Sequence, residues 1–134
     1  MALDAAYRGK GGRLLRWAYV DMDRYPLIPP DEAEDAVYYG YTELMADKDE
    51  DLQAWVGADD DAQLWLNDRL VWPGGSADKG WFFARIYGDY GDAVRDYNLS
   101  EGKRTVHVRK GRKKLFFKLS NGPTRLFFSL VLTK

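Results

Sequence analysis

Short stretches of alternating apolar and polar residues recur along the chain, and turn-forming residues separate them. The clearest example covers residues 57–72, where an acidic segment precedes the apolar-rich run 62–66, an Asn-Asp pair follows, and a second apolar run closes the segment. A period of two residues is typical of a strand with one buried face, and a short polar pair between two such runs favours a tight reversal. We therefore predict a β-hairpin here, with Leu64 and Leu66 packed inward.

The same alternation predicts further strands on both sides of this hairpin. They are rich in aromatic and β-branched residues, which favour a pleated surface. The predicted strands, including the two of the hairpin, are 14–22, 36–46, 52–56, 62–66, 69–72, 81–87, 104–108, 113–120 and 124–133. Beyond a single turn at 31–35, no stretch shows helical periodicity. About nine short strands with turn residues at this spacing predict an all-β, antiparallel sandwich of two sheets.

Three connecting segments complete the expected fold. Residues 1–12 are expected to form a loose lead-in, and 23–35 a proline-rich loop whose Tyr25, Leu27 and Ile28 fold back over the edge of the core. An Asn-Gly pair at 121–122 is a strong signal for a hairpin between the last two strands. The residues of these two strands predicted to face inward are Leu115, Phe117, Leu119, Leu126, Phe128, Leu130 and Leu132.

The composition is that of one globular domain. The chain has 134 residues, of which 46% are hydrophobic and 15% aromatic, and this is enough to bury a core without covalent staples. Cysteine is absent, which excludes disulfides and thiol chemistry. No apolar run approaches the roughly 20 residues that span a bilayer, and residues 1–12 lack the apolar stretch of a signal peptide. We therefore expect one module over 1–134, with no membrane partner.

Charge is distributed unevenly, although the formal net charge is only −1. Between residues 31 and 61, Lys48 stands against twelve acids: Asp31, Glu32, Glu34, Asp35, Glu43, Asp47, Asp49, Glu50, Asp51, Asp59, Asp60 and Asp61. From Glu101 onward one acid stands against ten basic residues: Lys103, Arg104, Arg109, Lys110, Arg112, Lys113, Lys114, Lys118, Arg125 and Lys134. We favour pairing of these two regions across neighbouring strands. The alternative is a basic face for an anionic polymer, formed by Arg109, Arg112, Lys114 and Lys118.

Residue types needed for common catalytic sites are scarce. His107 is the single histidine, and it lies between two valines of a predicted strand with no nucleophile nearby in the sequence. The chain has neither the Gly-x-Ser-x-Gly motif of hydrolases nor a phosphate-binding glycine loop before a helix. Paired carboxylates serve glycosidases, but acids on turns are common in any soluble β-domain. We therefore predict that the chain is not an enzyme.

The acidic turn Asp59-Asp60-Asp61 concentrates carboxylate oxygens at one place. Hard oxygen ligands suit Ca²⁺, and Asn67 would add an amide oxygen if the chain returned it to this turn. The alternative is that these carboxylates accept hydrogen bonds from nearby backbone N–H groups and stabilise the turn without an ion. The sequence therefore allows a calcium cofactor without requiring one.

Aromatic residues flank the loops that follow residue 72, namely Trp72, Trp81, Tyr87 and Tyr90. Exposed rings beside acids and amides are typical of sugar recognition, because a pyranose has an apolar face and a polar rim. Packing in the core is the alternative and is favoured for Trp65 and Trp81, whereas Trp72 is expected at an exposed rim. Nucleic acid is a less favoured partner, because the sequence pI is about 5.8 and no RNA-recognition motif is present.

Three motifs occur in a fixed order along the chain. They are GADD at 57–60 ahead of LWLNDRLV at 64–71, VHVRKG at 106–111, and LFFKLSNG at 115–122. A chain with this series resembles the jelly-roll accessory modules related to the protective-antigen sugar-binding domain. Such modules accompany bacterial glycoside hydrolases, esterases and other surface proteins. The resemblance covers about residues 36–132.

The resemblance implies a two-sheet jelly roll, carbohydrate binding in many members and an extracellular or cell-surface location. In some members the paired acids coordinate Ca²⁺ beside the sugar, which implies this role for Asp59 and Asp60. This chain departs from the family pattern in three places. Asp61 and Asp68 stand where the family has glycine, which makes a positive φ harder to reach. The segment 112–113 is Arg-Lys in place of an aromatic residue and Asn.

These observations lead to one expected function and two alternatives. We expect a non-catalytic carbohydrate-binding module, an accessory part of a larger secreted or surface protein, whose partners are a poly- or oligosaccharide and a catalytic domain of the same parent chain. The first alternative is a structural or protein-interaction module without a glycan ligand, and the second is a binder of anionic polysaccharide. The residues expected to contact sugar are Asp59, Asp60, Trp72, Trp81 and Tyr90.

Overall fold

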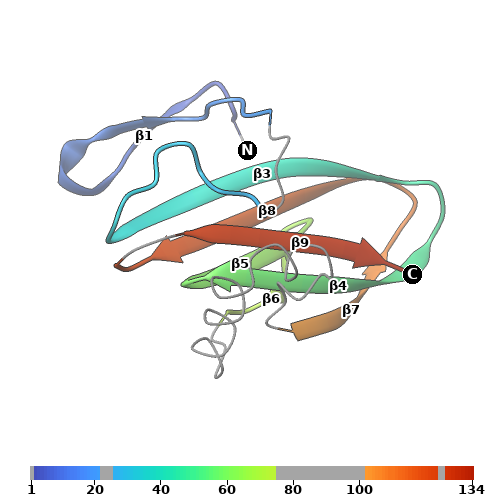
Figure 1. Ribbon diagram of the computed structural model, residues 1–134. Coiled ribbons are helices and arrows are strands. Elements are labelled where there is room, and N and C mark those ends of the chain that lie inside the picture. Colours follow the sequence, from blue (N-terminus) through green and yellow to red (C-terminus); the bar gives the residue numbers. More distant parts are fainter. Residues whose placement is uncertain (1, 22–25, 75–101, 124–125) are drawn as a thin grey trace.

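Strands dominate the computed structural model, which describes residues 2–21, 26–74, 102–123 and 126–134. Within these residues the chain is all-β, with nine strands in antiparallel sheets (Figure 1). The elements in chain order are β1 (Ala6–Arg8), a 3-10 turn (Lys10–Gly12), β2 (Leu14–Arg16), β3 (Ala36–Ala46), β4 (Glu50–Asp59), β5 (Asp61–Leu66), β6 (Arg69–Trp72), β7 (Gly102–Val108), β8 (Gly111–Asn121) and β9 (Phe127–Thr133).

The main body is a sandwich of a four-stranded sheet, in the order β3-β8-β5-β6, and a three-stranded sheet, in the order β7-β4-β9. One long antiparallel ribbon runs through both sheets. Strand β3 pairs with β8 from Ala36↔Asn121 to Ala46↔Gly111, and β4 then pairs with β7, beginning at Glu50↔Val108. A ribbon folded over on itself in this way is the wrapping of a jelly roll. The predicted two-sheet architecture is confirmed.

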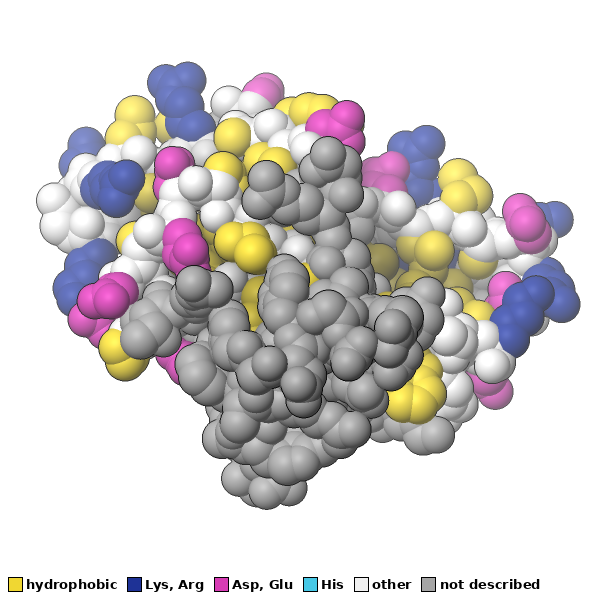
Figure 2. All heavy atoms as spheres, in the orientation of Figure 1, with side chains coloured by type: hydrophobic (Ala, Val, Ile, Leu, Met, Phe, Trp, Pro, Cys, Tyr) yellow, Lys and Arg dark blue, Asp and Glu magenta, His cyan; other side chains and the backbone are white. Residues whose placement is uncertain are grey.

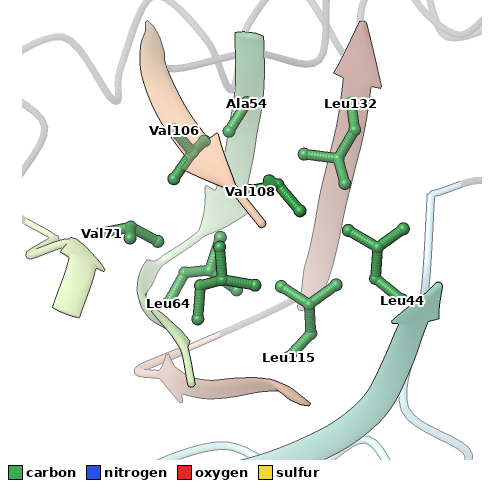
Figure 3. Close-up of a pocket in the computed structure, with 9 residues that line it drawn as sticks. Leu44, Ala54, Leu64, Val71, Val106, Val108, Leu115 and Leu132 are labelled. Atoms are coloured by element: carbon green, nitrogen blue, oxygen red, sulfur yellow. The ribbon is translucent and has the colours of Figure 1, made fainter. Parts of the chain in front are cut away.

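The core lies between the two sheets and follows from the period of two. In β5 the residues Ala62, Leu64 and Leu66 are buried, while the residues between them are partly exposed. Figure 3 shows Leu64 and Leu115 of the larger sheet pointing toward Val108 of the smaller one. The gap left between these apolar side chains has a volume of only about 10 Å³, so the two sheets are closely packed.

A glycine allows one aromatic ring to lie flat on the sheet. Gly40 of β3 is opposite Phe117 of β8, and a Cβ atom added at Gly40 would come within 1.9 Å of that ring. The other side of the Phe117 ring stacks on Phe128 of β9, with ring centroids 4.3 Å apart. Phe117 therefore connects the backbone of one sheet to the side chains of the other.

Most predicted strands and the first reversal are confirmed. Strand β3 has the predicted bounds, and the turn between β5 and β6 has positive φ at Asn67 (47°) and Asp68 (65°), as a tight two-residue hairpin requires. Strand β2 is shorter than the predicted 14–22. Residues 1–12, expected to be a loose lead-in, instead contain β1, which pairs with β2. The predicted strand 81–87 lies outside the described residues.

The hairpin predicted at Asn121-Gly122 does not form. Strand β8 ends in the larger sheet and β9 belongs to the smaller one, so this segment crosses between sheets. Gly122 does not adopt the positive φ of a two-residue hairpin turn, and the Asn121 side chain donates a hydrogen bond to the carbonyl of Ala33 (2.7 Å). Long-range contacts thus override the local turn preference of the Asn-Gly pair.

The proline-rich loop folds back over the edge of the core at Leu27, as predicted. Leu27 exchanges two backbone hydrogen bonds of 2.8 Å with Phe128 and packs against the core. Further along the loop, the Glu32 carboxylate accepts a hydrogen bond from the backbone N–H of Leu126 (2.6 Å). The segment 31–35 forms no helical turn, and Asp35 has a φ of 51°. Tyr25 lies outside the described residues.

The β1–β2 hairpin projects from the sandwich (Figure 1). All six residues of its two strands are exposed. Its exposed apolar side chains include Tyr7, Leu14 and Leu15. Isolated two-stranded hairpins are marginally stable in water, so this element depends on the chain that follows it.

Candidate functional site

The acidic turn is built into the fold by hydrogen bonds. Asp59 ends β4, where its backbone pairs with Phe127. Asp60 follows, and its Oδ2 accepts a hydrogen bond from the backbone N–H of Gly122, while its own N–H donates to the carbonyl of Ser120 (3.1 Å). A Cβ atom at Gly122 would lie 2.9 Å from Asp60 Oδ2. The hydrogen bonds of Asp60 therefore hold the turn between β4 and β5 against the segment that follows β8 and crosses between the sheets.

Other acids of the same region have similar structural partners. Asp61 Oδ1 accepts from the backbone N–H of Ala62 (2.9 Å), and Asp49 Oδ1 accepts from that of Lys110 (2.7 Å). Within the described ranges, no three His, Asp or Glu side chains lie close enough together to hold a metal ion. The structure thus supports the hydrogen-bonding alternative for Asp60, and calcium at Asp59 and Asp60 remains a prediction.

Trp72 packs against the core instead of standing at an exposed rim. The pairing of β5 with β6 runs from Trp65↔Leu70 to Leu64↔Trp72 and skips Val71. This bulge turns Trp72 to the same side as the buried Leu64. The guanidinium carbon of Arg104 lies 5.4 Å from the centre of the Trp72 ring. Trp81 and Tyr90, the other predicted aromatic contacts, lie outside the described residues.

A different group of aromatic rings lies on the outer face of the larger sheet, centred on Phe116 of β8. Tyr39 of β3 stacks on Phe116 with ring centroids 5.8 Å apart and planes 18° apart. Trp65 of β5 lies 5.5 Å away on the other side, and Trp17, which follows β2, meets the ring edge-on at 6.5 Å. We call these four residues the aromatic platform.

An open groove lies beside the platform. Its lining consists of Trp65, Phe116, Asp68 and Lys114, and its volume is about 310 Å³. The two rings belong to adjacent, paired strands, since Trp65 is opposite Phe116. One carboxylate and one ammonium group are thus held beside a pair of rings on a rigid sheet, which is the chemistry of a small-molecule site.

The reversal between β5 and β6 positions the polar wall of this groove. Asn67 donates its backbone N–H to the carbonyl of Lys114 (3.0 Å), and its side-chain Oδ1 accepts the N–H of Lys114 (2.9 Å). These two bonds fix the turn against β8, although Asn67 itself is exposed. Asp68 and Lys114 are consequently held on the same side of the sheet as the rings.

Glu43 determines which cations of this face remain available. Its Oε2 lies 3.4 Å from Arg112 Nε, and its Oε1 accepts a hydrogen bond from the hydroxyl of Tyr41 (2.9 Å). This hydrogen bond, together with partial burial and the nearby negative charge, raises the pKa of the Tyr41 hydroxyl above its usual value. Both oxygens of Glu43 therefore have partners other than Lys114, the residue opposite it in β8.

Elsewhere the acidic and basic regions pair, as favoured from the sequence. Strand β3 carries acids and pairs with β8, which carries bases, and β4 carries acids and pairs with β7, which carries bases, and with β9, which Lys134 follows. Besides the pair formed by Glu43, Lys134 Nζ lies 3.9 Å from Glu50 Oε2. Figure 2 shows acidic and basic side chains beside each other at both ends of the molecule. Part of the uneven charge along the chain is thus compensated in the fold.

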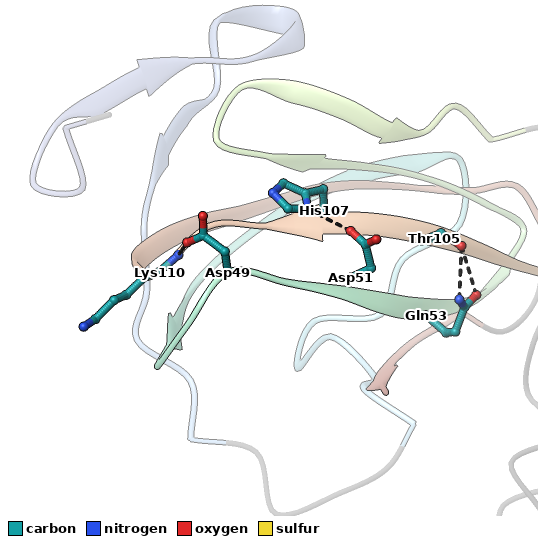
Figure 4. A network of polar contacts seen from close by, with 6 residues as sticks. All are labelled: Asp49, Asp51, Gln53, Thr105, His107 and Lys110. Carbon is teal, nitrogen blue, oxygen red and sulfur yellow. Dashed lines mark hydrogen bonds and ion pairs between the residues drawn. The ribbon is translucent and has the colours of Figure 1, made fainter.

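His107 belongs to a polar row on the outer face of the smaller sheet (Figure 4). Its Nδ1 lies 2.7 Å from Asp51 Oδ1, and both side chains are more than half exposed, at 53% and 65%. The next pair along the row is Gln53 and Thr105, whose Nε2 and Oγ1 are 3.0 Å apart. The Thr105 hydroxyl is thus engaged by an amide and not by the imidazole.

The groove contains residues outside the sugar site predicted from the sequence. Core packing is the favoured prediction for Trp65, yet the inward prediction for Leu64 and Leu66 already places the residue between them on the outer face. The same alternation places Phe116 on the outer face, because it lies between two inward-facing residues. The proximity of these two rings could not be foreseen, since it depends on the pairing of β5 with β8.

In comparisons with known proteins, no protein-family model, no curated protein and no solved structure matches the chain. In the described part of the chain, no helix has the length and hydropathy needed to cross a membrane.

Proposed function

We propose that this chain is a non-catalytic carbohydrate-binding module that serves as an accessory part of a larger secreted or surface protein. The observation that carries the proposal is the groove lined by Trp65, Phe116, Asp68 and Lys114. Aromatic rings bind the apolar face of a pyranose, while a carboxylate and an ammonium group exchange hydrogen bonds with its hydroxyls. The motif series that resembles sugar-binding jelly rolls points the same way.

The groove is suited to binding a ligand without catalysing a reaction. Its rings sit on paired strands and its turn is fixed by Asn67, so a ligand meets a preformed surface and little has to become ordered. Its one carboxylate, that of Asp68, has no second acid among the groove-lining residues. Glycoside hydrolysis needs two carboxyl groups that flank the bond to be cleaved.

Affinity electrophoresis in gels that contain neutral or acidic polysaccharides tests the proposal. We expect retardation of the wild type on at least one polymer and its loss in Trp65→Ala. Trp55→Ala is the matched control, because Trp55 is a partly exposed tryptophan of the other sheet, where it donates a hydrogen bond to Thr133 (3.0 Å). No retardation of the wild type on any polymer would contradict the proposed function.

The same experiment separates the groove from the site predicted from the sequence. Trp81→Ala and Tyr90→Ala alter the predicted contacts that lie outside the described residues. Loss of retardation in these variants but not in Trp65→Ala would move the sugar site away from the groove. Loss in Trp65→Ala alone would assign it to the groove. Circular dichroism of each variant shows whether the β-sandwich is intact.

A protein-interaction role is the second candidate, and the β1–β2 hairpin favours it. Its exposed apolar residues, among them Tyr7 and Leu14, suit a contact with another domain of a parent chain. Deletion of residues 2–16 tests this role, because it removes the hairpin and leaves every strand of the sandwich in place. Loss of association with the parent protein, with sugar retention unchanged, would support it.

A further inference from the structure

The outer face of β8 alternates cations with an aromatic ring. Arg112, Lys114, Phe116 and Lys118 occupy every second position, and the residues between them face the core. Because a strand rises about 3.3 Å per residue, Lys114 and Lys118 lie about 13 Å apart with Phe116 midway between them. A ligand that lies on Phe116 therefore comes within reach of a cation on either side.

Two of these three cations lack an acidic partner within the described residues. Arg112 is neutralised by Glu43, whose other oxygen accepts the hydroxyl of Tyr41. That arrangement leaves Lys114 without an ion pair, although Glu43 is opposite it in the neighbouring strand. Lys118 is flanked by Tyr39 in β3 and Gln63 in β5, and neither carries a charge.

The groove also has an acidic side. Asp68 lines it together with Lys114, yet these two side chains form no ion pair with each other in this structure. A ligand for such a groove needs an anionic group for the lysine and hydroxyl donors for the aspartate. A neutral sugar lacks the first, and a densely sulfated polymer places many negative charges near Asp68. A sugar with one carboxylate and several hydroxyls supplies both.

We propose that the groove binds a uronic-acid-containing oligosaccharide, with Lys114 as the partner of a sugar carboxylate, Asp68 as an acceptor for sugar hydroxyls and the Trp65 and Phe116 rings as the stacking surface. This inference rests on the proposed carbohydrate-binding function and names its ligand class. Lys118 extends the site along β8 toward the next acidic sugar, which favours an oligomer over a single ring. The formal net charge of −1 means that the attraction is local to this face.

Isothermal titration with an oligogalacturonide and with its methyl ester tests the inference, because esterification removes the negative charge and leaves the sugar rings unchanged. We expect the acidic form to bind at least about tenfold more tightly than the ester, as a charge-assisted hydrogen bond provides. Lys114→Gln should lower the affinity for the acid by a similar factor and leave binding of the ester unchanged. Arg112→Gln is the matched control, since Glu43 already neutralises Arg112.

Failure of the inference can be distinguished from failure of the proposed function. Equal affinity for the acid and its ester, or tight binding of neutral polysaccharides alone, would overturn the uronate ligand and leave a sugar-binding module. Equally tight binding of dextran sulfate, with equal losses in Lys114→Gln and Arg112→Gln, would overturn it in favour of a general polyanion surface. Absence of binding to every acidic and neutral polymer would contradict the proposed function itself.

Discussion

Single residues explain why an acid-rich sequence need not be a metal site. Asp49, Asp60 and Glu32 each accept a hydrogen bond from a backbone N–H of a segment distant in the sequence. A carboxylate is well suited to such a role, because bonds to a charged acceptor are stronger than neutral ones. Three of the twelve acids in residues 31–61 therefore connect segments of the fold by accepting backbone hydrogen bonds.

Gly40 should tolerate no side chain while Phe117 is present. Gly40→Ala places a methyl group where the ring lies, and we expect a loss of about 1–3 kcal/mol in the free energy of unfolding. In a Phe117→Ala background the same change should cost little, because the ring that causes the clash is gone. Urea denaturation of the four proteins of this double-mutant cycle measures the difference, and additive losses would contradict the stacking described.

Tyr41 should titrate at higher pH than an ordinary tyrosine, whose pKa is about 10. Its hydroxyl donates to Glu43, so ionisation breaks this bond and places two negative charges together. A folded-state pKa above the unfolded one means that the associated stability is present below pH 10 and is lost as the pH rises through the folded-state pKa. Alkaline absorbance titration should show the pKa falling in Glu43→Ala, with Tyr41→Phe identifying the signal.

At this scale the sequence indicates which side of a strand a residue occupies, but not what it meets there. The inward positions Leu64, Leu66 and Leu119 follow from the period of two alone. The bond from Gly122 to Asp60 joins residues that the sequence does not relate. For Trp72 even the side differs from the alternating pattern, because a bulge at Val71 turns its side chain toward the core.

Among the elements, the two turns predicted most strongly had opposite outcomes. The reversal at Asn67-Asp68 forms because both of its strands belong to one sheet and the Asn67 side chain fixes it to β8. The Asn-Gly pair at 121–122 forms no hairpin because β9 joins the other sheet, where it pairs with β4. A local turn signal is decisive when the flanking strands pair with each other, and pairing is a long-range property.

Replacing Asp68 with glycine should stabilise the β5–β6 turn. Asp68 has a φ of 65°, which is costly for a residue with a Cβ atom, and we expect Asp68→Gly to raise the free energy of unfolding by about 1 kcal/mol. Asn67→Gly is the control, because it relieves a similar φ of 47° but loses the bond to Lys114 and should bring no gain. Thermal melts compare the two variants, and an equal gain in both would argue against the role of the Asn67 side chain.

The fold of the whole molecule matches the predicted architecture. The candidate groove, however, does not lie at the residues that the sequence predicts as sugar contacts. The seven strands of the sandwich, their two antiparallel sheets and the wrapped ribbon agree with the predicted architecture. The candidate groove requires β5 and β8 to be neighbours, and nothing in the local sequence of 61–66 or 111–121 specifies that pairing. The grouping of the platform rings could therefore not be predicted from the sequence, although alternation along the strands indicates the side that Tyr39, Trp65 and Phe116 occupy.

Salt should affect ligand binding and leave the fold largely unchanged. The described ion pairs between acidic and basic strands are mostly exposed, with 68% and 43% exposure for Arg112 and Glu43, so each contributes less than about 1 kcal/mol. We expect the free energy of unfolding to change little between low salt and 1 M NaCl, whereas affinity for an acidic oligosaccharide falls. Denaturation and titration at both salt concentrations measure this, and a loss of several kcal/mol in stability would contradict it.

The wrapped ribbon also determines how the chain must fold. Ala36 pairs with Asn121 at one end of the ribbon, so most ladder contacts join residues far apart in the sequence. Such high contact order makes folding slow, on the order of milliseconds to seconds for β-sandwiches, since loop-closure entropy is lost before pairing is gained. Among the described strands of the sandwich, β5 and β6 alone are consecutive and paired, and we therefore expect their hairpin to form early in folding. The turn at Asp68, which lines the candidate groove, would then be among the first parts of the sandwich to become ordered.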